Sequence, residues 1–377
     1  MIRTTRVVAP TVTGELSRPT RVGVAGYGYW GPKVVRNFAA LPHAELVAVC
    51  DLVPERLVKV QEQYPGVQVT TDFAELLASD VEAVAIATPV ATHFTLARQA
   101  LLAGKHVFME KPLTASTQEA AELVALAKAR GCVLMVDHPF LFEPAVECLR
   151  EVVQSGELGE IWHITSQRLN LGLFRRDANV LWDLAPHDVA ILLAVLGTAP
   201  TAVSARGASH VQPGIHDVVY LNLQFPQGTM AHVHVSWLEP QKVRRMTIVG
   251  SRKMAVYDDL APEKLCVYDR RVCYAREGDP TAELLYHLGA TTAIPLPAVE
   301  PLYHLCAHFV DCVRGEAQPR ADGWQGLQVV HILEQADRSL HNGGSSERLD
   351  GAALNPVAHV PWSDGTAWPR PAVALAR

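Results

Sequence analysis

The segment "NVLWDLAPHDVAILLAVLG" holds two side chains, Asp183 and His187, whose types and spacing suit proton transfer. They are four residues apart, so in a helix they lie on the same face. A carboxylate beside an imidazole sets the tautomer and the basicity of the ring, as a general base requires. The same spacing also fits an aspartate that caps the start of a helix and a histidine that packs in the core. From spacing alone, this second interpretation is the stronger one.

A second candidate is the stretch Gly26-Tyr27-Gly28-Tyr29-Trp30-Gly31, which fits the pattern G-x-G-x-x-G. The pattern is weak by itself, but here "RVGVAG", typical of a buried strand, precedes it and "PKVVRNFAA", typical of a helix, follows it. In that context Gly26 makes a tight turn, Gly28 lets the backbone approach a pyrophosphate, and Gly31 lets helix and strand pack closely. The helix N-terminus offers free N–H groups to the phosphates. We therefore predict a dinucleotide-binding turn, and a bare strand–helix turn is the alternative.

Asp51 ends the second predicted strand, about 20 residues after the last glycine. A carboxylate there accepts hydrogen bonds from both ribose hydroxyls and repels a 2′-phosphate, so the sequence favours NAD as the cofactor. Arg56 lies a little further along and leaves NADP open. Tyr29 and Trp30, within the turn, could line the nicotinamide side of the cleft or simply pack, and packing is favoured for Trp30.

Glu110-Lys111-Pro112 closes another strand-like stretch, "KHVFME". Ligands of open α/β sheets bind at the carboxyl ends of the strands, so Lys111 is expected to face the nicotinamide. The alternative is a surface lysine at a strand end, which is the usual environment of lysine.

The elements that would position these residues alternate along residues 21–137. Apolar, β-branched stretches typical of buried strands are separated by amphipathic helical segments, which predicts a parallel sheet with helices on both faces. Strict alternation in "VVYLNLQF" and "MAHVHVSW" predicts an antiparallel sheet within Thr201–Asp258. One face of that sheet is expected to be buried through Leu221, Leu223 and Phe225.

The predicted fold class is α/β, with an N-terminal Rossmann dinucleotide-binding domain (21–137) and a C-terminal substrate-binding α+β domain (138–342). The second domain is expected to contain a large, mostly antiparallel open sheet. An N-terminal extension (1–20) and a Gly/Pro-rich tail (343–377) complete the chain. Helices of the second domain are expected near Glu143–Gly156, Asp183–Leu196, Leu302–Arg314 and Gly323–His341.

Composition restricts the partners of a chain of this length. The 377 residues carry 33 basic and 39 acidic side chains, and the net charge of −6 argues against nucleic-acid or anionic-membrane partners. No apolar run approaches the ~20 residues of a membrane helix and no signal peptide is recognised, so a cytoplasmic protein is expected. Seven cysteines without a C-x-x-C pair fit buried thiols better than disulfides or zinc. His232 and His234 alternate on one strand without a third ligand, so no metal site is predicted.

Four motifs together resemble the Gfo/Idh/MocA-type oxidoreductases, a family that includes inositol dehydrogenase and glucose-fructose oxidoreductase. The resemblance runs from about Arg21 to Gly344. The motifs are Gly26-x-Gly28-x-x-Gly31, "ATPVATH" (Ala87–His93), "AGKHVFMEKP" (Ala103–Pro112) and Asp183-x-x-x-His187. Each motif is modest, but together, in this order, they are highly specific.

The resemblance implies roles for individual residues. Lys111, Asp183 and His187 would surround the substrate carbinol: His187 accepts the hydroxyl proton, Asp183 stabilises the imidazolium, and Lys111 binds the same oxygen. Cofactor contacts are expected from Gly26, Gly28, Tyr29, Trp30, Gly31, Asp51, Thr88, Pro89, His93, Glu110 and Lys111. Substrate contacts are expected from His138 in "DHPFLF", and from Arg168, Asn170 and Asn179.

Within the family, "GYGYWGPKVVRNF" and "NVLWDLAPHDVAIL" are most similar to members that act on nucleotide sugars or related glycosides, often at the C3 hydroxyl. Such dehydrogenases commonly precede an aminotransferase that converts the 3-keto group into an amine. A 3-ketoreductase working in the opposite direction would have the same motifs. Alternatives from other classes are an NAD-dependent glycosidase and a non-catalytic NAD-binding regulator, although the intact Lys111, Asp183 and His187 count against a regulator.

The predicted antiparallel sheet also bears on association. One of its faces carries Tyr220, Asn222, His232 and His234, and the helices of one domain are too few to cover it. A homodimer or homotetramer is therefore expected, as in similar proteins.

Overall fold

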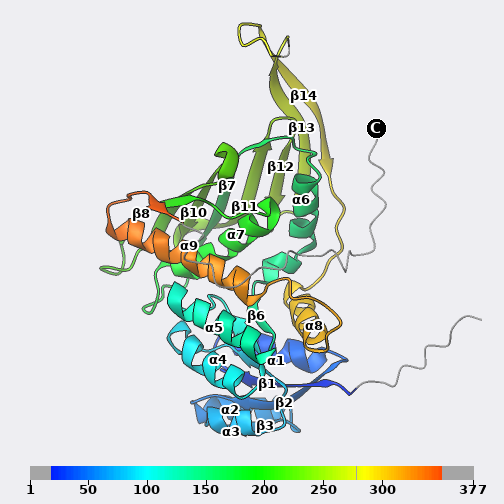
Figure 1. The fold of residues 1–377 in the computed structure, drawn as a ribbon, viewed down its shortest axis with the longest axis vertical. Helices are drawn as coiled ribbons and strands as arrows, with labels where there is room; N and C mark the ends of the chain where they lie inside the picture. The colour runs from blue at the N-terminus through cyan, green and yellow to red at the C-terminus, as the bar shows by residue number, and fades with distance from the viewer. Residues whose placement is uncertain (1–17, 277, 350–377) are drawn as a thin grey trace, which may run out of the picture.

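The computed structural model describes residues 18–276 and 278–349. Most of the predicted N-terminal extension (1–20) and C-terminal tail (343–377) lies outside these residues. Figure 1 shows a smaller sheet with its helices at the bottom and a larger sheet above it, and the β13–β14 hairpin projects from the top.

The first sheet has six parallel strands in the order β3-β2-β1-β4-β5-β6. The predicted Rossmann arrangement is confirmed, and the strand order reverses between β1 and β4, where such sheets bind dinucleotides. Its elements are β1 (Thr20–Ala25), α1 (Gly31–Ala40), β2 (Ala44–Cys50), α2 (Pro54–Gln63), β3 (Gln68–Thr70), α3 (Phe73–Ala78), β4 (Ala83–Ile86), η1 (Val90–Thr92), α4 (His93–Leu102), β5 (His106–Glu110), α5 (Thr117–Arg130) and β6 (Leu134–Asp137).

Helix α3 is too short to be recognised from the sequence. Its six residues are too few to show a helical period, and the Asp72 carboxylate, which accepts a hydrogen bond from the Ala74 N–H at 2.8 Å, marks its start.

The second sheet has nine strands in the order β14-β13-β12-β11-β7-β10-β9-β8-β15, and only the β7–β10 pair is parallel. The prediction of a mostly antiparallel open sheet is therefore confirmed. The remaining elements are η2 (Pro139–Phe142), α6 (Pro144–Gln154), β7 (Ile161–Leu171), α7 (Val180–Leu196), β8 (Ala202–Ala208), β9 (Val218–Gln224), η3 (Pro226–Gly228), β10 (Met230–Ser236), β11 (Leu238–Gly250), β12 (Met254–Asp258), β13 (Leu265–Tyr274), β14 (Leu284–Ala293), α8 (Pro301–Val313), α9 (Gly323–His341) and β15 (Glu347–Arg348).

The predicted extent of this sheet, Thr201–Asp258, is too narrow, because β7, β13, β14 and β15 lie outside it. The outer parts of β13 and β14 are exposed on both faces, so their sequence lacks the alternation that marks a half-buried strand.

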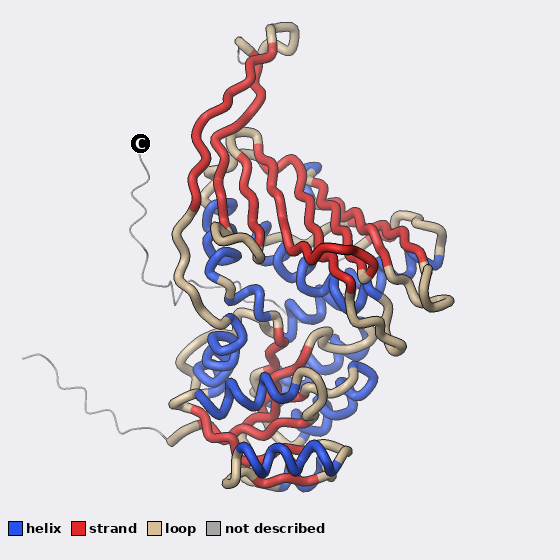
Figure 2. Tube along the Cα trace, turned by 180° about the vertical axis from the view of Figure 1, so that it is seen from behind, coloured by secondary structure: helices blue, strands red, loops and turns tan. Residues whose placement is uncertain are grey.

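One face of the large sheet packs on helices and the other does not. Leu221, Leu223 and Phe225 are buried on the helix-covered face, as predicted. Figure 2 shows the opposite face, over which none of the described helices lies. Tyr220, His232 and His234 lie together on that face, and the Tyr220 ring stacks on His234 with a centroid distance of 4.2 Å.

Two helices near the end of the described chain return to the first sheet. Phe309 of α8 makes edge contacts with Phe38 and Phe108, at centroid distances of 6.1 and 5.5 Å. The Val136 N–H of β6 donates to the Ala321 carbonyl at 2.8 Å, just before α9. One hydrophobic core runs through both sheets, so the two halves pack directly against each other. The domain boundary after residue 137 stays a prediction.

Within the described residues, no helix is long and apolar enough to cross a membrane. The same residues contain no group of three or more histidine, cysteine, aspartate or glutamate side chains placed to hold a metal ion. Three of the cysteines are buried, but Cys273 on the projecting hairpin is exposed, contrary to the prediction of buried thiols.

The uncovered sheet face leads to a prediction about assembly. We expect the face around Tyr220 and His234 to pack against a second copy of the chain, giving a dimer or tetramer at micromolar concentration. Tyr220→Lys combined with His234→Glu should convert the assembly to monomers in light scattering, because buried charges would lie in the interface. Arg98→Glu on α4 serves as the control and should leave the mass unchanged. A monomeric wild-type protein would contradict the prediction.

Candidate active site

The glycine-rich turn between β1 and α1 has two glycines that the fold itself demands. Gly26 has a positive φ of 97°, and a Cβ atom there would lie 2.5 Å from the Ala87 carbonyl oxygen. A Cβ atom on Gly31 would lie 2.0 Å from the Gly26 carbonyl oxygen. At Gly28, the nearest atom to an added Cβ is 3.8 Å away, so the protein leaves this position open. An open glycine beside a helix N-terminus without a side-chain cap fits the close approach of a pyrophosphate.

Asp51 connects this turn to the end of β2. Its buried carboxylate accepts hydrogen bonds from the Tyr27 N–H at 2.6 Å and the Val53 N–H at 2.8 Å. Arg56 Nη1 lies 3.3 Å from both carboxylate oxygens. Each carboxylate oxygen has two acceptor sites, so Asp51 keeps capacity for a ribose hydroxyl. The half-exposed Arg56 guanidinium lies at the same corner, where a 2′-phosphate would be placed.

His93 is buried within the protein rather than exposed on the side where the cofactor is expected to bind. Its ring is 1% exposed, with Nε2 2.9 Å from the Thr88 carbonyl and Nδ1 2.9 Å from the Pro112 carbonyl. Burial lowers the pKa of His93. In the structure His93 holds the loops of Thr88 and Pro112 together, and its contact with the cofactor stays a prediction. Thr88 itself is partly exposed at the end of β4, and Pro89 is exposed.

Lys111 joins the first sheet to α7. It follows β5 and precedes a cis peptide bond to Pro112. Its Nζ donates to the Asp183 backbone carbonyl at 2.6 Å and lies 3.5 Å from Asp183 Oδ1. Lys111 is only 12% exposed and Asp183 18%, so this lysine is not a surface lysine. The ammonium is therefore fixed at the boundary between the two halves.

The Asp183 carboxylate is occupied by partners other than His187. Oδ2 accepts from the Trp237 indole N–H at 3.0 Å, and Oδ1 lies 3.6 Å from Arg175 Nη1. Among the hydrogen bonds and ion pairs of the described chain, none joins Asp183 to His187. The expected support of the imidazolium by Asp183 is thus not present as a direct hydrogen bond, because the carboxylate accepts from Trp237 and lies beside Lys111 instead.

His187 is partly buried, and its buried Nδ1 atom has no hydrogen-bond partner within the described chain. The ring packs edge-on against Phe140 at a centroid distance of 5.1 Å. Burial lowers the pKa of His187 well below its usual value, and the positive charges of Lys111, Arg168 and Arg244 lower it further. His187 is therefore neutral at neutral pH and able to accept a proton.

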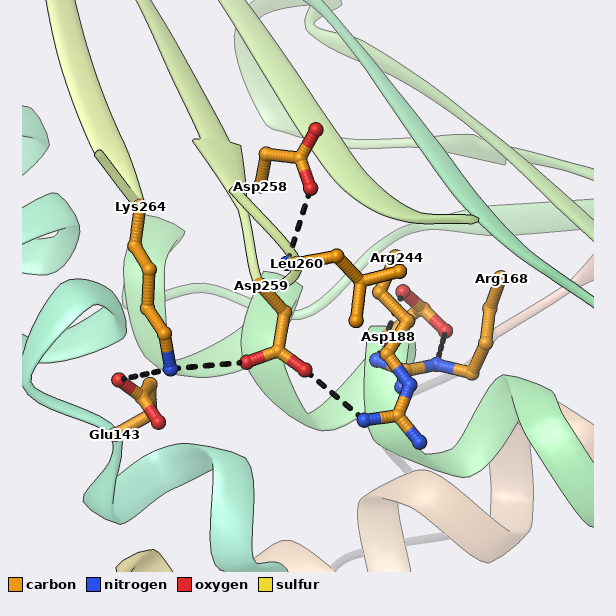
Figure 3. A network of polar contacts seen from close by, with 8 residues as sticks. All are labelled: Glu143, Arg168, Asp188, Arg244, Asp258, Asp259, Leu260 and Lys264. Atoms are coloured by element: carbon orange, nitrogen blue, oxygen red, sulfur yellow. Dashed lines mark hydrogen bonds and ion pairs between the residues drawn. The ribbon is translucent and has the colours of Figure 1, made fainter. Parts of the chain in front are cut away.

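Phe140 is held by two arginines on the helix-covered face of the large sheet. Arg168 and Arg244 lie directly opposite each other on β7 and β11, with their guanidinium carbons 4.4 and 5.4 Å from the Phe140 ring centre. Two like charges in register repel each other, and each is neutralised by a carboxylate. Asp188 accepts from Arg168 Nε at 2.6 Å, and Asp259 accepts from Arg244 Nη1 at 2.9 Å, as Figure 3 shows.

The network in Figure 3 extends to the start of α6. Lys264 Nζ bridges Asp259 Oδ1 at 3.3 Å and Glu143 Oε1 at 3.1 Å. The predicted substrate residue Arg168 is thus 5% exposed and paired within the protein, and it acts on the site through Phe140 and through its charge. Arg244, Asp188 and Trp237 were missed by the sequence reasoning, because their contacts depend on the register of β11 with β7 and on the packing of α7, for which no local sequence signal exists.

The other predicted residues divide between the cleft and its support. His138 is buried with neither ring nitrogen hydrogen-bonded, and burial and then the Lys111 charge lower its pKa to about 3. Asn170 Oδ1 is likewise buried without a hydrogen bond. Asn179 instead caps α7, accepting from the Trp182 N–H at 3.3 Å. Tyr29 is 81% exposed, whereas Trp30 packs and donates its indole N–H to Asp137 at 2.5 Å.

Comparison with known proteins places this arrangement in a family. Residues 20–138 match the "Oxidoreductase family, NAD-binding Rossmann fold" and residues 146–256 match the "GFO/IDH/MocA C-terminal domain". The chain belongs to the Gfo/Idh/MocA family. It is an NAD-dependent oxidoreductase, and the glycine turn, Asp51 and the carboxyl ends of β4 and β5 fit that cofactor.

Several relatives share most of the fold. The UDP-N-acetylglucosamine 3-dehydrogenase of Acidithiobacillus ferrooxidans is 32% identical over 246 residues, covering 64% of this chain and 74% of that one. Its solved structure has a TM-score of 0.73 at 27% identity, covering 86% of this chain and 98% of that chain. The structure of GenD2, from gentamicin A biosynthesis, in complex with NAD has a TM-score of 0.76 at 25% identity, covering 91% and 100% of the two chains.

The contacts of Asp51 predict the cofactor preference. NAD should bind more tightly than NADP, and Asp51→Ala should narrow the difference by removing the charge that repels a 2′-phosphate. The same change removes the acceptor of two backbone N–H groups, so the melting temperature should fall as well. Asp72→Ala, which removes only the cap of α3, is the control and should not alter the preference. Titrations showing tighter binding of NADP to the wild type would refute the prediction.

The environment of His187 predicts the pH dependence of turnover. Because its pKa is lowered well below about 6.5, activity should persist as the pH falls through that value and decline only at lower pH. Arg244→Gln removes one of the charges that lower this pKa, so the acid limb of the rate profile should move to higher pH. Arg245→Gln, on the opposite face of β11, is the control. An unmoved limb in folded Arg244→Gln would contradict the assignment of His187 as the base.

Proposed function

We propose that this oxidoreductase oxidises a ring hydroxyl, at C3, of a nucleotide sugar or related glycoside to a ketone, ahead of transamination in amino-sugar biosynthesis. The observation that carries the proposal is a fixed ammonium, Lys111, at the carboxyl edge of the NAD-binding sheet, whose charge acts on a neutral imidazole, His187, with no hydrogen-bond partner at Nδ1. The similarity to a UDP-N-acetylglucosamine 3-dehydrogenase supports the substrate class.

In the proposed reaction, His187 accepts the hydroxyl proton as the carbinol carbon gives up its hydride. The bound NAD supplies the hydride acceptor. Lys111 donates a hydrogen bond to the substrate oxygen and stabilises the negative charge that develops there as it becomes a carbonyl. Asp183 acts as a positioning residue, because its carbonyl and carboxylate hold the Lys111 ammonium in place.

The buried polar atoms support a polyhydroxylated substrate. His138 Nδ1 and Nε2, His187 Nδ1 and Asn170 Oδ1 are all buried without a hydrogen bond. Such atoms cost free energy unless a ligand or water completes them. A sugar ring carries adjacent hydroxyls that both donate and accept, and it can satisfy imidazole nitrogens and an amide oxygen together.

The opposite direction, reduction of a 3-keto sugar, is the second candidate. It is favoured by a 3-reductase acting on a dTDP-linked keto sugar from Streptomyces violaceoruber, which is 38% identical over 148 residues. That match covers 39% of this chain and 43% of the reductase, so the dehydrogenase remains the first proposal.

A labelled-substrate experiment tests the proposal. The purified protein, NAD and a panel of nucleotide sugars and simple glycosides should yield a product lighter by two hydrogen atoms in mass spectrometry. With substrate deuterated at C3 the label should appear in the reduced coenzyme, whereas label at C4 should stay in the sugar. His187→Asn should lower turnover by about 10²–10⁴-fold with little change in NAD affinity. Transfer of label from another carbon would overturn the C3 assignment, and release of free sugar without reduced coenzyme would indicate a glycosidase.

A further inference from the structure

Two acidic side chains lie next to each other where β5 and β6 end. Glu110 and Asp137 are partners in the register of these parallel strands, so their side chains lie side by side at the carboxyl edge of the sheet. Glu110 Oε2 and Asp137 Oδ1 are both buried, and neither has a hydrogen-bond partner. When both groups are ionised, the two oxygens are acceptors only, and the buried charges repel each other.

The acid pair is connected to the cofactor side of the cleft. The Trp30 indole, within the glycine-rich turn, donates to Asp137 Oδ2 at 2.5 Å. Lys111 is the next residue after Glu110, and its charge acts on both carboxyls. Two further ionisable neighbours are Arg175, from the segment before α7, and the buried Cys306 of α8.

We propose that Glu110 and Asp137 share a single proton, so that they form one acid pair of charge −1 that holds Trp30 and favours the oxidised, positively charged nicotinamide over the reduced, neutral one. Glu110 carries the proton on Oε2 and donates it in a hydrogen bond to Asp137 Oδ1. This one proton satisfies both unpartnered oxygens and removes the repulsion between the two groups.

The electrostatic surroundings agree with this arrangement. Burial, followed by the charge of Asp137, raises the pKa of Glu110 well above its usual value. Burial also raises the pKa of Asp137, while the hydrogen bond from Trp30 and the charge of Lys111 favour its ionised form. Glu110 is thus the protonated partner and Asp137 the carboxylate that Trp30 requires as an acceptor.

The consequence for the coenzyme follows from charge. The negative charge of the acid pair, beside Lys111 and Trp30, attracts the cationic nicotinamide ring of NAD. It has no comparable attraction for the neutral ring of NADH. The pair therefore contributes to retaining NAD and releasing NADH, whatever alcohol is oxidised. This inference depends on NAD binding and not on the proposed sugar, so failure to find a sugar substrate would leave it intact.

Infrared spectroscopy of the full-length protein tests the shared proton directly. The wild type at neutral pH should show the carbonyl stretch of a protonated carboxylic acid. Heavy-carbon labelling of the glutamates should shift this band, and Glu110→Gln should abolish it. Glu122→Gln, a surface glutamate paired with Arg98, is the control and should leave the band in place. Absence of the band from the wild type, or a band that labelled glutamates do not shift, would overturn the proposal.

Binding and stability measurements test the role of the pair. Glu110→Gln places an amide donor where the shared proton was, so its melting temperature should stay near that of the wild type, whereas Glu110→Ala should lower it. In titrations, Glu110→Gln keeps the charge of −1 and should preserve the ratio of NAD to NADH affinity. The double variant Glu110→Gln with Asp137→Asn removes that charge, and the ratio should fall by about tenfold. An unchanged ratio in the folded double variant, or equal destabilisation by Gln and Ala at position 110, would overturn the proposal.

Discussion

The contact between Lys111 and Asp183 is the constraint on which the rest of the site depends. Lys111 directly follows a strand of the first sheet, and Asp183 lies in the first turn of a helix that packs on the second sheet. Asp183 neutralises the Lys111 ammonium only when this strand and this helix lie at a fixed distance from each other. Removing one member of a shielded ion pair leaves an uncompensated charge, which penalises alternative arrangements of the two halves. With that distance fixed, the next turn of α7 brings His187 into the cleft.

The same cleft gathers polar groups that the folded chain does not satisfy. Elsewhere the carboxylates and cations of the described core are mostly paired, as in the Arg168–Asp188 and Arg244–Asp259 contacts. Around the cleft, the imidazoles of His138 and His187 and the amide of Asn170 keep buried atoms without partners. Such groups reduce stability, and a chain retains them where a ligand completes them. The site therefore holds polar groups that a bound substrate could satisfy.

The positive charges around His187 have two effects that act in the same direction. Lys111, Arg168 and Arg244 lower the pKa of the imidazole, which keeps it neutral and ready to accept a proton. They also stabilise negative charge on an oxygen from which a proton is leaving, because fixed cations in a shielded site act more strongly than in water. Phe140 connects these groups, because its ring packs edge-on against His187 and lies beside both arginines.

The sequence by itself determined the alternation of strands and helices in the first half, the glycine turn and the placement of Asp51 and Lys111 at strand ends. These features depend on local periodicity and on backbone sterics at Gly26 and Gly31, which neighbouring residues reveal. The extent of the second sheet was only partly predictable, because β13 and β14 lack alternation where both faces are exposed.

Tertiary structure alone decided which partners the site residues meet. The spacing of Asp183 and His187 suggested a direct pair, but in the fold the Asp183 carboxylate meets Trp237 and Lys111, which are distant in sequence. His93 and Asn179 have supporting roles because loops and a helix start close over them. Strand register makes Glu110 a neighbour of Asp137, and it makes Arg168 a neighbour of Arg244. Register depends on how whole strands pack against one another, and no single stretch of sequence encodes it.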